Sequence, residues 1–132
     1  MKVRFLFFFA LLTSFSFAQS LNDFRAVIVP LKFDFQKNKN EYRVSTLTKH
    51  NLAKAGFEAF YTEETNPYDK CSLLYIDVIN VKAFLATKMY FVLKACNGKE
   101  IFISTTGYTK VKDYPLAYTE AINQAFNSLY AM

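Results

Sequence analysis

The chain has 132 residues, of which 52% are hydrophobic and 18% aromatic, and it contains only three glycines and three prolines. That composition is typical of a packed domain and argues against a disordered chain. The net charge of +5 comes from basic residues scattered along the sequence, so we expect no nucleic-acid partner.

Residues 1–18 have the pattern of a cleavable secretory signal peptide. Lys2 and Arg4 supply the positive start, an unbroken apolar run covers residues 5–12, and small residues precede a cleavage point before Gln19. The alternative is an uncleaved anchor, but the apolar run is shorter than the ~20 residues that span a bilayer. We therefore expect an exported protein, periplasmic or extracellular, with no later membrane-spanning segment.

Cleavage would leave a single domain over residues 19–132, and the loss of Lys2 and Arg4 would lower the net charge from +5 to +3. Position 19 is not a cysteine, so the lipid attachment of bacterial lipoproteins is not expected and the mature chain should be soluble. The sequence stops at Met132 without a polar tail, which leaves open a further C-terminal segment.

The first half of the mature chain reads as strand, helix, strand. Residues 24–31 are apolar on both faces at their centre, as in an interior strand. Residues 41–55 follow a helical period, with Asn38 as a candidate N-cap, and Gly56 stops the helix. A short strand over residues 57–62 would complete a parallel unit.

Three strands and a helix make up the second half. The strands are expected over residues 71–81, 87–96 and 99–108, with a type I′ turn at Asn97-Gly98 between the last two. An amphipathic helix begins near Asp113. The order β-α-β-β-β-β-α predicts a two-layer α+β sandwich, in which a mixed five-stranded sheet carries two helices on one face.

Two cysteines in an exported chain suggest a disulfide. If Cys71 faces Cys96 across a hairpin, then Tyr75 opposes Val92 and Asp77 opposes Tyr90. That register places apolar residues on one face and a mixed set on the other, and a slip of one residue would destroy the sorting. We therefore expect the disulfide, against the alternative of two buried thiols.

No residue pattern indicates catalysis, a cofactor or a bound metal. His50 is the sole histidine and falls on a charged helix face. Glu63, Glu64 and Asp69 share a loop without the spacing of a calcium site. Asp77 interrupts an apolar strand, but no second carboxylate is placed to form an acid–base pair with it.

The mixed face of the sheet is the strongest functional lead. It carries more apolar and aromatic side chains than a solvent-facing sheet usually does. Either a further layer covers the face or it binds a partner. The candidate interaction residues are Tyr75, Tyr90, Val92, Ile101 and Ile103.

The sequence resembles an uncharacterised family of small bacterial secreted proteins. The likeness covers nearly all of the mature chain, and its most specific part is the Cys-Asn-Gly-Lys turn at residues 96–99 with the upstream Cys71. That family has no assigned function to carry over, and its members are often longer. The element order also looks like the periplasmic α/β domains of the TolB amino-terminal, CsgG and LpoB type, which bind other proteins in cell-envelope assemblies.

The leading hypothesis is a non-catalytic envelope domain that binds another protein, of unknown identity, through its mixed sheet face. Two alternatives come from other functional classes. One is a small hydrolase that uses carboxylates such as Asp77. The other is a carrier that holds a small apolar ligand in a cavity between sheet and helices.

Overall fold

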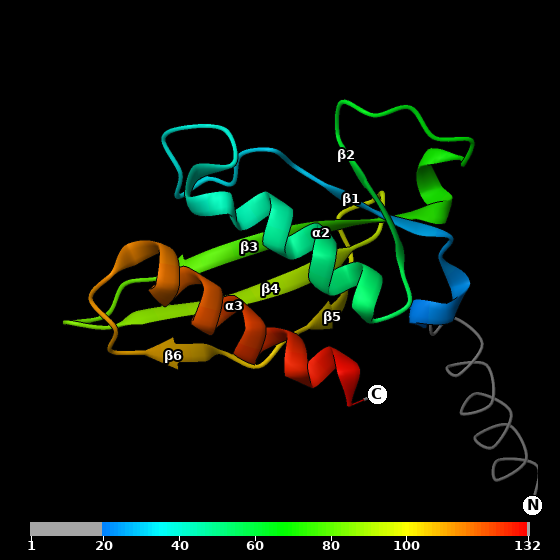
Figure 1. Ribbon diagram of the computed structural model, residues 1–132. Helices are drawn as coiled ribbons and strands as arrows, with labels where there is room; N and C mark the ends of the chain where they lie inside the picture. The colour runs from blue at the N-terminus through cyan, green and yellow to red at the C-terminus, as the bar shows by residue number, and fades with distance from the viewer. Residues whose placement is uncertain (1–19, 132) are drawn as a thin grey trace, which may run out of the picture.

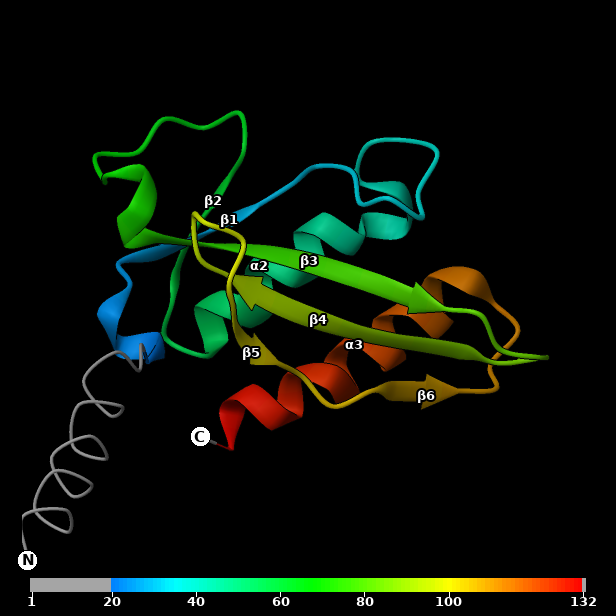
Figure 2. The same ribbon diagram turned by 180° about the vertical axis from the view of Figure 1, so that it is seen from behind.

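A computed structural model describes residues 20–131, and the predicted signal segment lies outside the described residues. A mixed sheet carries two helices on one face (Figure 1), and the opposite face has no helix over it (Figure 2). The predicted two-layer α+β architecture is therefore confirmed. The strands are β1 (Ala26–Val29), β2 (Glu58–Tyr61), β3 (Leu73–Val81), β4 (Thr87–Lys94), β5 (Glu100–Ile103) and β6 (Gly107–Thr109). The helices are α2 (Val44–Lys54) and α3 (Tyr114–Tyr130), and short 3₁₀ turns are η1 (Leu21–Asp23), η2 (Glu41–Arg43) and η3 (Lys70–Ser72).

The strands follow the spatial order β2-β1-β3-β4-β5, and β6 also pairs with β4. β1 runs parallel to β2, as the strand–helix–strand pattern predicts. It is also parallel to β3, and the remaining pairs are antiparallel. All four residues of β1 are buried. Val27 and Val29 face the main core, while Ala26 and Ile28 pack with Leu73 on the other face. An interior strand of this kind explains the continuous apolar run in the sequence.

The main core lies between the sheet and the two helices. Phe91 of β4 stacks on Phe126 of α3, with ring centroids 4.2 Å apart. The two helices meet at Asn51, which is buried and donates to the side-chain oxygen of Asn123 over 3.0 Å. The side-chain oxygen of Asn51 in turn accepts from the hydroxyl of Tyr130. This polar junction fixes α2 against α3 within an otherwise apolar layer.

The start of the first helix differs from the prediction. Asn38 does not cap α2, because its side chain donates to Glu41 instead. The side-chain oxygen of Asn40 accepts from the backbone N–H of Thr46 and so satisfies a free donor in the first turn of α2. Tyr42 has φ +54, so the predicted continuous helix from residue 41 is broken into η2 and α2.

The turn between β4 and β5 is a hairpin, but the predicted type I′ turn is wrong. Only Gly98 has a positive φ, of +86, whereas type I′ needs positive values at both central residues. The N–H of Gly98 donates to the carbonyl of Ala95, and Asn97 accepts from the N–H of Lys99 through its side chain. These bonds fit a type I turn followed by a left-handed glycine.

The predicted strand over residues 99–108 is interrupted, which gives β5 and β6. Gly107 starts β6 and lies against the backbone of α3. A Cβ at this position would stand 1.8 Å from the carbonyl oxygen of Ala121. The close approach of strand and helix therefore requires glycine.

Candidate functional site: the open face of the sheet

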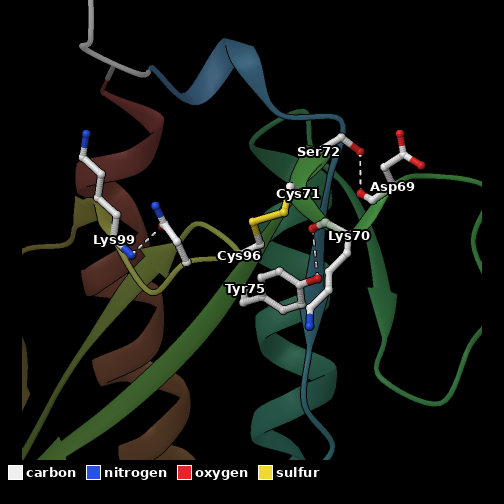
Figure 3. The surroundings of a disulfide bond; sticks show 8 residues. Asp69, Lys70, Cys71, Ser72, Tyr75, Cys96 and Lys99 are labelled. Atoms are coloured by element: carbon white, nitrogen blue, oxygen red, sulfur yellow. Dashed lines mark hydrogen bonds between the residues drawn. A yellow bond between two sulfur atoms is a disulfide. The ribbon is translucent and has the colours of Figure 1, made fainter.

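The disulfide between Cys71 and Cys96 is confirmed, with a Cα–Cα distance of 5.0 Å. It joins η3 to the turn after β4 (Figure 3), and so closes one end of the β3–β4 pair. Tyr75 lies beside it, and its hydroxyl donates to the carbonyl of Lys70 over 3.1 Å. The cysteines thus lie just outside the strand ladder rather than within it.

The predicted register is wrong by two residues. Tyr75 pairs with Lys94 rather than Val92, and Asp77 pairs with Val92 rather than Tyr90. Side chains alternate with a period of two along a strand, so a slip of two leaves every residue on its predicted face. The apolar face is buried as expected, from Leu74 on β3 to Phe91 on β4.

We use "open face" for the sheet surface that lies opposite the helices in Figure 2. It holds apolar, aromatic and charged side chains from four strands. Tyr90 is half-buried, Ile103 is 57% exposed, and Tyr108 is exposed, with the Lys88 ammonium 5.7 Å from its ring centroid. The residues of the open face are Tyr75, Asp77, Ile79, Lys88, Tyr90, Val92, Lys94, Ile103 and Tyr108.

Two of the predicted interaction residues are not available on the open face, one because it is buried there and one because it lies elsewhere. Val92 lies on the open face between Asp77 and Ile103 but is only 3% exposed. Ile101 falls at an irregularity in the β4–β5 register and packs against the main core. Tyr75, Tyr90 and Ile103 keep their predicted face, and Tyr108 of β6 joins them there.

Asp77 is the carboxylate of the open face. Its partial burial raises its pKa, the Lys94 ammonium 3.9 Å away lowers it, and the Asp34 carboxylate raises it further. The side chain remains 34% exposed, and its ion-pair partner is Lys94. Asp77 and Lys94 therefore form a surface ion pair rather than an acid–base pair of carboxyl groups.

The other titratable candidates lie in surface ion pairs or in solvent. Glu63 accepts from Lys39 over 3.0 Å, and Glu64 accepts from Lys49 over 2.9 Å. His50 is exposed on α2. Within residues 20–131, no three His, Cys, Asp or Glu side chains are grouped in a way that could hold a metal ion.

The space between the sheet and α3 is filled. Val78, Phe91, Ile122 and Phe126 surround a small gap that has no room for a water molecule. Over the part of the chain that the structure describes, no helix has the length and apolar character needed to cross a membrane.

The sequence predicts a connection between the strands at residues 71–81 and 87–96, but its exposed apolar side chains were not among the candidate interaction residues. We call residues 82–86 the hairpin tip. Phe84 and Leu85 are 91% and 76% exposed there. The available signal was an apolar pair in a segment that had to be a turn between two strands.

Comparisons with known proteins add a fold relationship. No family model and no curated protein matches the chain. Among solved structures, a PelC dodecamer from Paraburkholderia phytofirmans is similar, with a TM-score of 0.54 and 14% sequence identity. The match covers 87% of this chain and 95% of the PelC chain. At this identity the likeness concerns the fold alone.

Proposed function

We propose that the protein is an exported, non-catalytic domain that binds another protein of the cell envelope through the open face. The observation that carries the proposal is the composition of that face. Tyr75, Tyr90, Ile103 and Tyr108 present aromatic and aliphatic surface on the side of the sheet that neither helix covers. Tyrosine in such a position is enriched at protein interfaces, because its ring is apolar and its hydroxyl can still bond water.

Charge adds to the suitability of the open face for a protein partner. Lys88 and Lys94 of β4 lie on it together with Asp77 of β3, and the Lys94 ammonium is 3.9 Å from the Asp77 carboxylate. A patch with both signs around an apolar centre fixes the orientation of a bound protein. The filled interior and the lysine-paired Asp77 favour this proposal over an apolar-ligand carrier or a carboxylate hydrolase.

Site-specific photo-crosslinking in the cells that make the protein tests the proposal. A photoreactive phenylalanine at position 90 or 108 should give a discrete protein adduct, since both tyrosines lie on the open face. The matched control is the same probe at His50, which is exposed on α2. Adducts from His50 alone, or none from the open face, contradict the proposal.

A second variant shows whether the adduct depends on the face itself. Tyr90→Ala combined with Ile103→Ser removes apolar surface from the open face, and Ile103 is exposed enough to be replaced without opening the core. The adduct from a probe at position 108 should then be lost, while circular dichroism stays unchanged. An adduct that persists in this folded variant rejects the open face as the binding surface.

A second copy of this chain is the first partner that we propose to test. The dodecameric state is a property of the PelC structure, and its fold likeness makes self-association a concrete candidate here. Mass spectrometry of the adduct separates the two outcomes, because self-association doubles the mass of the chain and any other partner gives a different mass.

A further inference from the structure

The hairpin tip carries two apolar side chains that the fold does not bury. Phe84 and Leu85 are 91% and 76% exposed, at adjacent positions. The tip projects past the end of the sheet, on the side of the molecule away from both ends of the described chain (Figures 1 and 2). Neither residue therefore contributes to the core.

The backbone also gives no reason for an apolar residue at the tip. Leu85 has φ +54, in the left-handed region where glycine or asparagine is preferred and a bulky side chain is disfavoured. An exposed leucine in this conformation points to a role outside the fold.

Lysines surround the tip. One groove beside it is lined by Lys82, Phe84 and Tyr114. A second groove is lined by Leu85 together with Lys110 and Lys112. All three lysines are exposed, and among the described residues none of them forms an ion pair.

The start of α3 extends the apolar surface. Tyr114 is 60% exposed and Leu116 is 48% exposed. The nearby carboxylate of Asp113 accepts from the backbone N–H of Leu116 and so is engaged at the start of the helix. This end of the molecule thus combines the exposed apolar side chains of the hairpin tip with an excess of positively charged side chains.

We propose that the hairpin tip docks the protein on an anionic lipid surface. Phe84 and Leu85 insert among the lipids, while Lys82, Lys110 and Lys112 bind the headgroups. Two side chains on a narrow projection can bury little surface compared with the about 1,600 Å² that a standard protein interface buries. Interfacial membrane binding instead gains from any buried apolar side chain and from each lysine near anionic headgroups. The inference does not depend on the open face.

Vesicle binding tests the proposal on the disulfide-bonded chain that begins at Gln19, which contains every described element and lacks the apolar leader. The probes are phosphatidylcholine vesicles with and without phosphatidylglycerol. Binding should require phosphatidylglycerol and weaken as salt is raised. Absence of binding to the anionic vesicles overturns the proposal.

Two pairs of variants locate the contact. Phe84→Ser with Leu85→Ser should reduce the affinity for anionic vesicles about tenfold or more. Lys110→Gln should reduce it about fivefold. The matched controls are Ile103→Ser on the open face and Lys99→Gln near the disulfide, both exposed and both expected to bind as the unchanged chain does. Equal losses in the controls would mean unspecific attraction and overturn the assignment.

The sequence contains no tryptophan, so Phe84→Trp supplies a single fluorescent reporter at the tip. Its emission should shift to the blue on anionic vesicles and be quenched by brominated lipids, because the indole enters the bilayer. An Ile103→Trp reporter on the open face should show neither effect. A Phe84→Trp emission that stays unchanged while the protein binds vesicles overturns insertion of the tip.

Discussion

The two ends of the β3–β4 pair differ in how they are held. At one end, the disulfide between Cys71 and Cys96 closes the ladder, and Tyr75 bonds back to Lys70. At the other, the hairpin tip leaves Phe84 and Leu85 in solvent. The first end shows what stabilises the fold. The second retains features that cost stability, which is where a binding role is expected.

The tip end depends on close packing rather than on a covalent bond, so its most sensitive position is Gly107. Gly107→Ala places a methyl group against the carbonyl of Ala121 and should lower the free energy of unfolding by about 3 kcal/mol or more, because strand and helix must separate. Urea unfolding measures the loss. Thr106→Ala, at an exposed neighbour, is the control, and equal stabilities for the two variants would show that α3 can shift without cost.

The opposite end should respond to loss of its covalent bond. Cys71→Ser with Cys96→Ser removes a link between residues 25 positions apart and should cost about 3 kcal/mol on the chain-entropy model. Denaturant unfolding checks the value, and reduction of the unchanged protein should give the same loss. If the double variant remains sensitive to reductant, the effect has another origin.

The helix junction is expected to have a smaller effect. Asn51→Leu removes the side-chain partner of Asn123 and one acceptor of the Tyr130 hydroxyl, which keeps the backbone carbonyl of residue 51, and should lower the free energy of unfolding by about 1 kcal/mol. Thermal unfolding can measure it. Tyr130→Phe removes one of these bonds and should cost less, so a larger loss in Tyr130→Phe would contradict this account.

The smallest expected effect is the pH dependence from Asp77. Its pKa is raised above the ordinary value of 3.8, mainly by burial, so the folded protein binds the proton more tightly than the unfolded chain. The free energy of unfolding should therefore fall as pH rises from 3.8 through the folded pKa. Asp77→Asn lacks this contribution. The free energy of unfolding of the unchanged chain minus that of Asp77→Asn should therefore decline as pH rises over that window. A difference that rises with pH would reverse the assignment.

The sequence could predict which face each strand residue occupies, because apolar alternation on β3 and β4 sorts core from surface. It could not fix the register, since pairing Tyr75 with Val92 or with Lys94 gives the same faces. It also misplaced Ile101, because the β4–β5 irregularity breaks the alternation. The burial of Val92 depends on neighbours that the pattern of one strand does not contain.

The packing of α3 also has a consequence for how the chain is made. Tyr114–Tyr130 is synthesised after all the strands that it covers, and Phe126 supplies the ring that stacks on Phe91. A growing chain consequently holds the apolar side of β4 without its cover until this segment has emerged. Completion of the core therefore follows the synthesis of all the strands from β1 to β6.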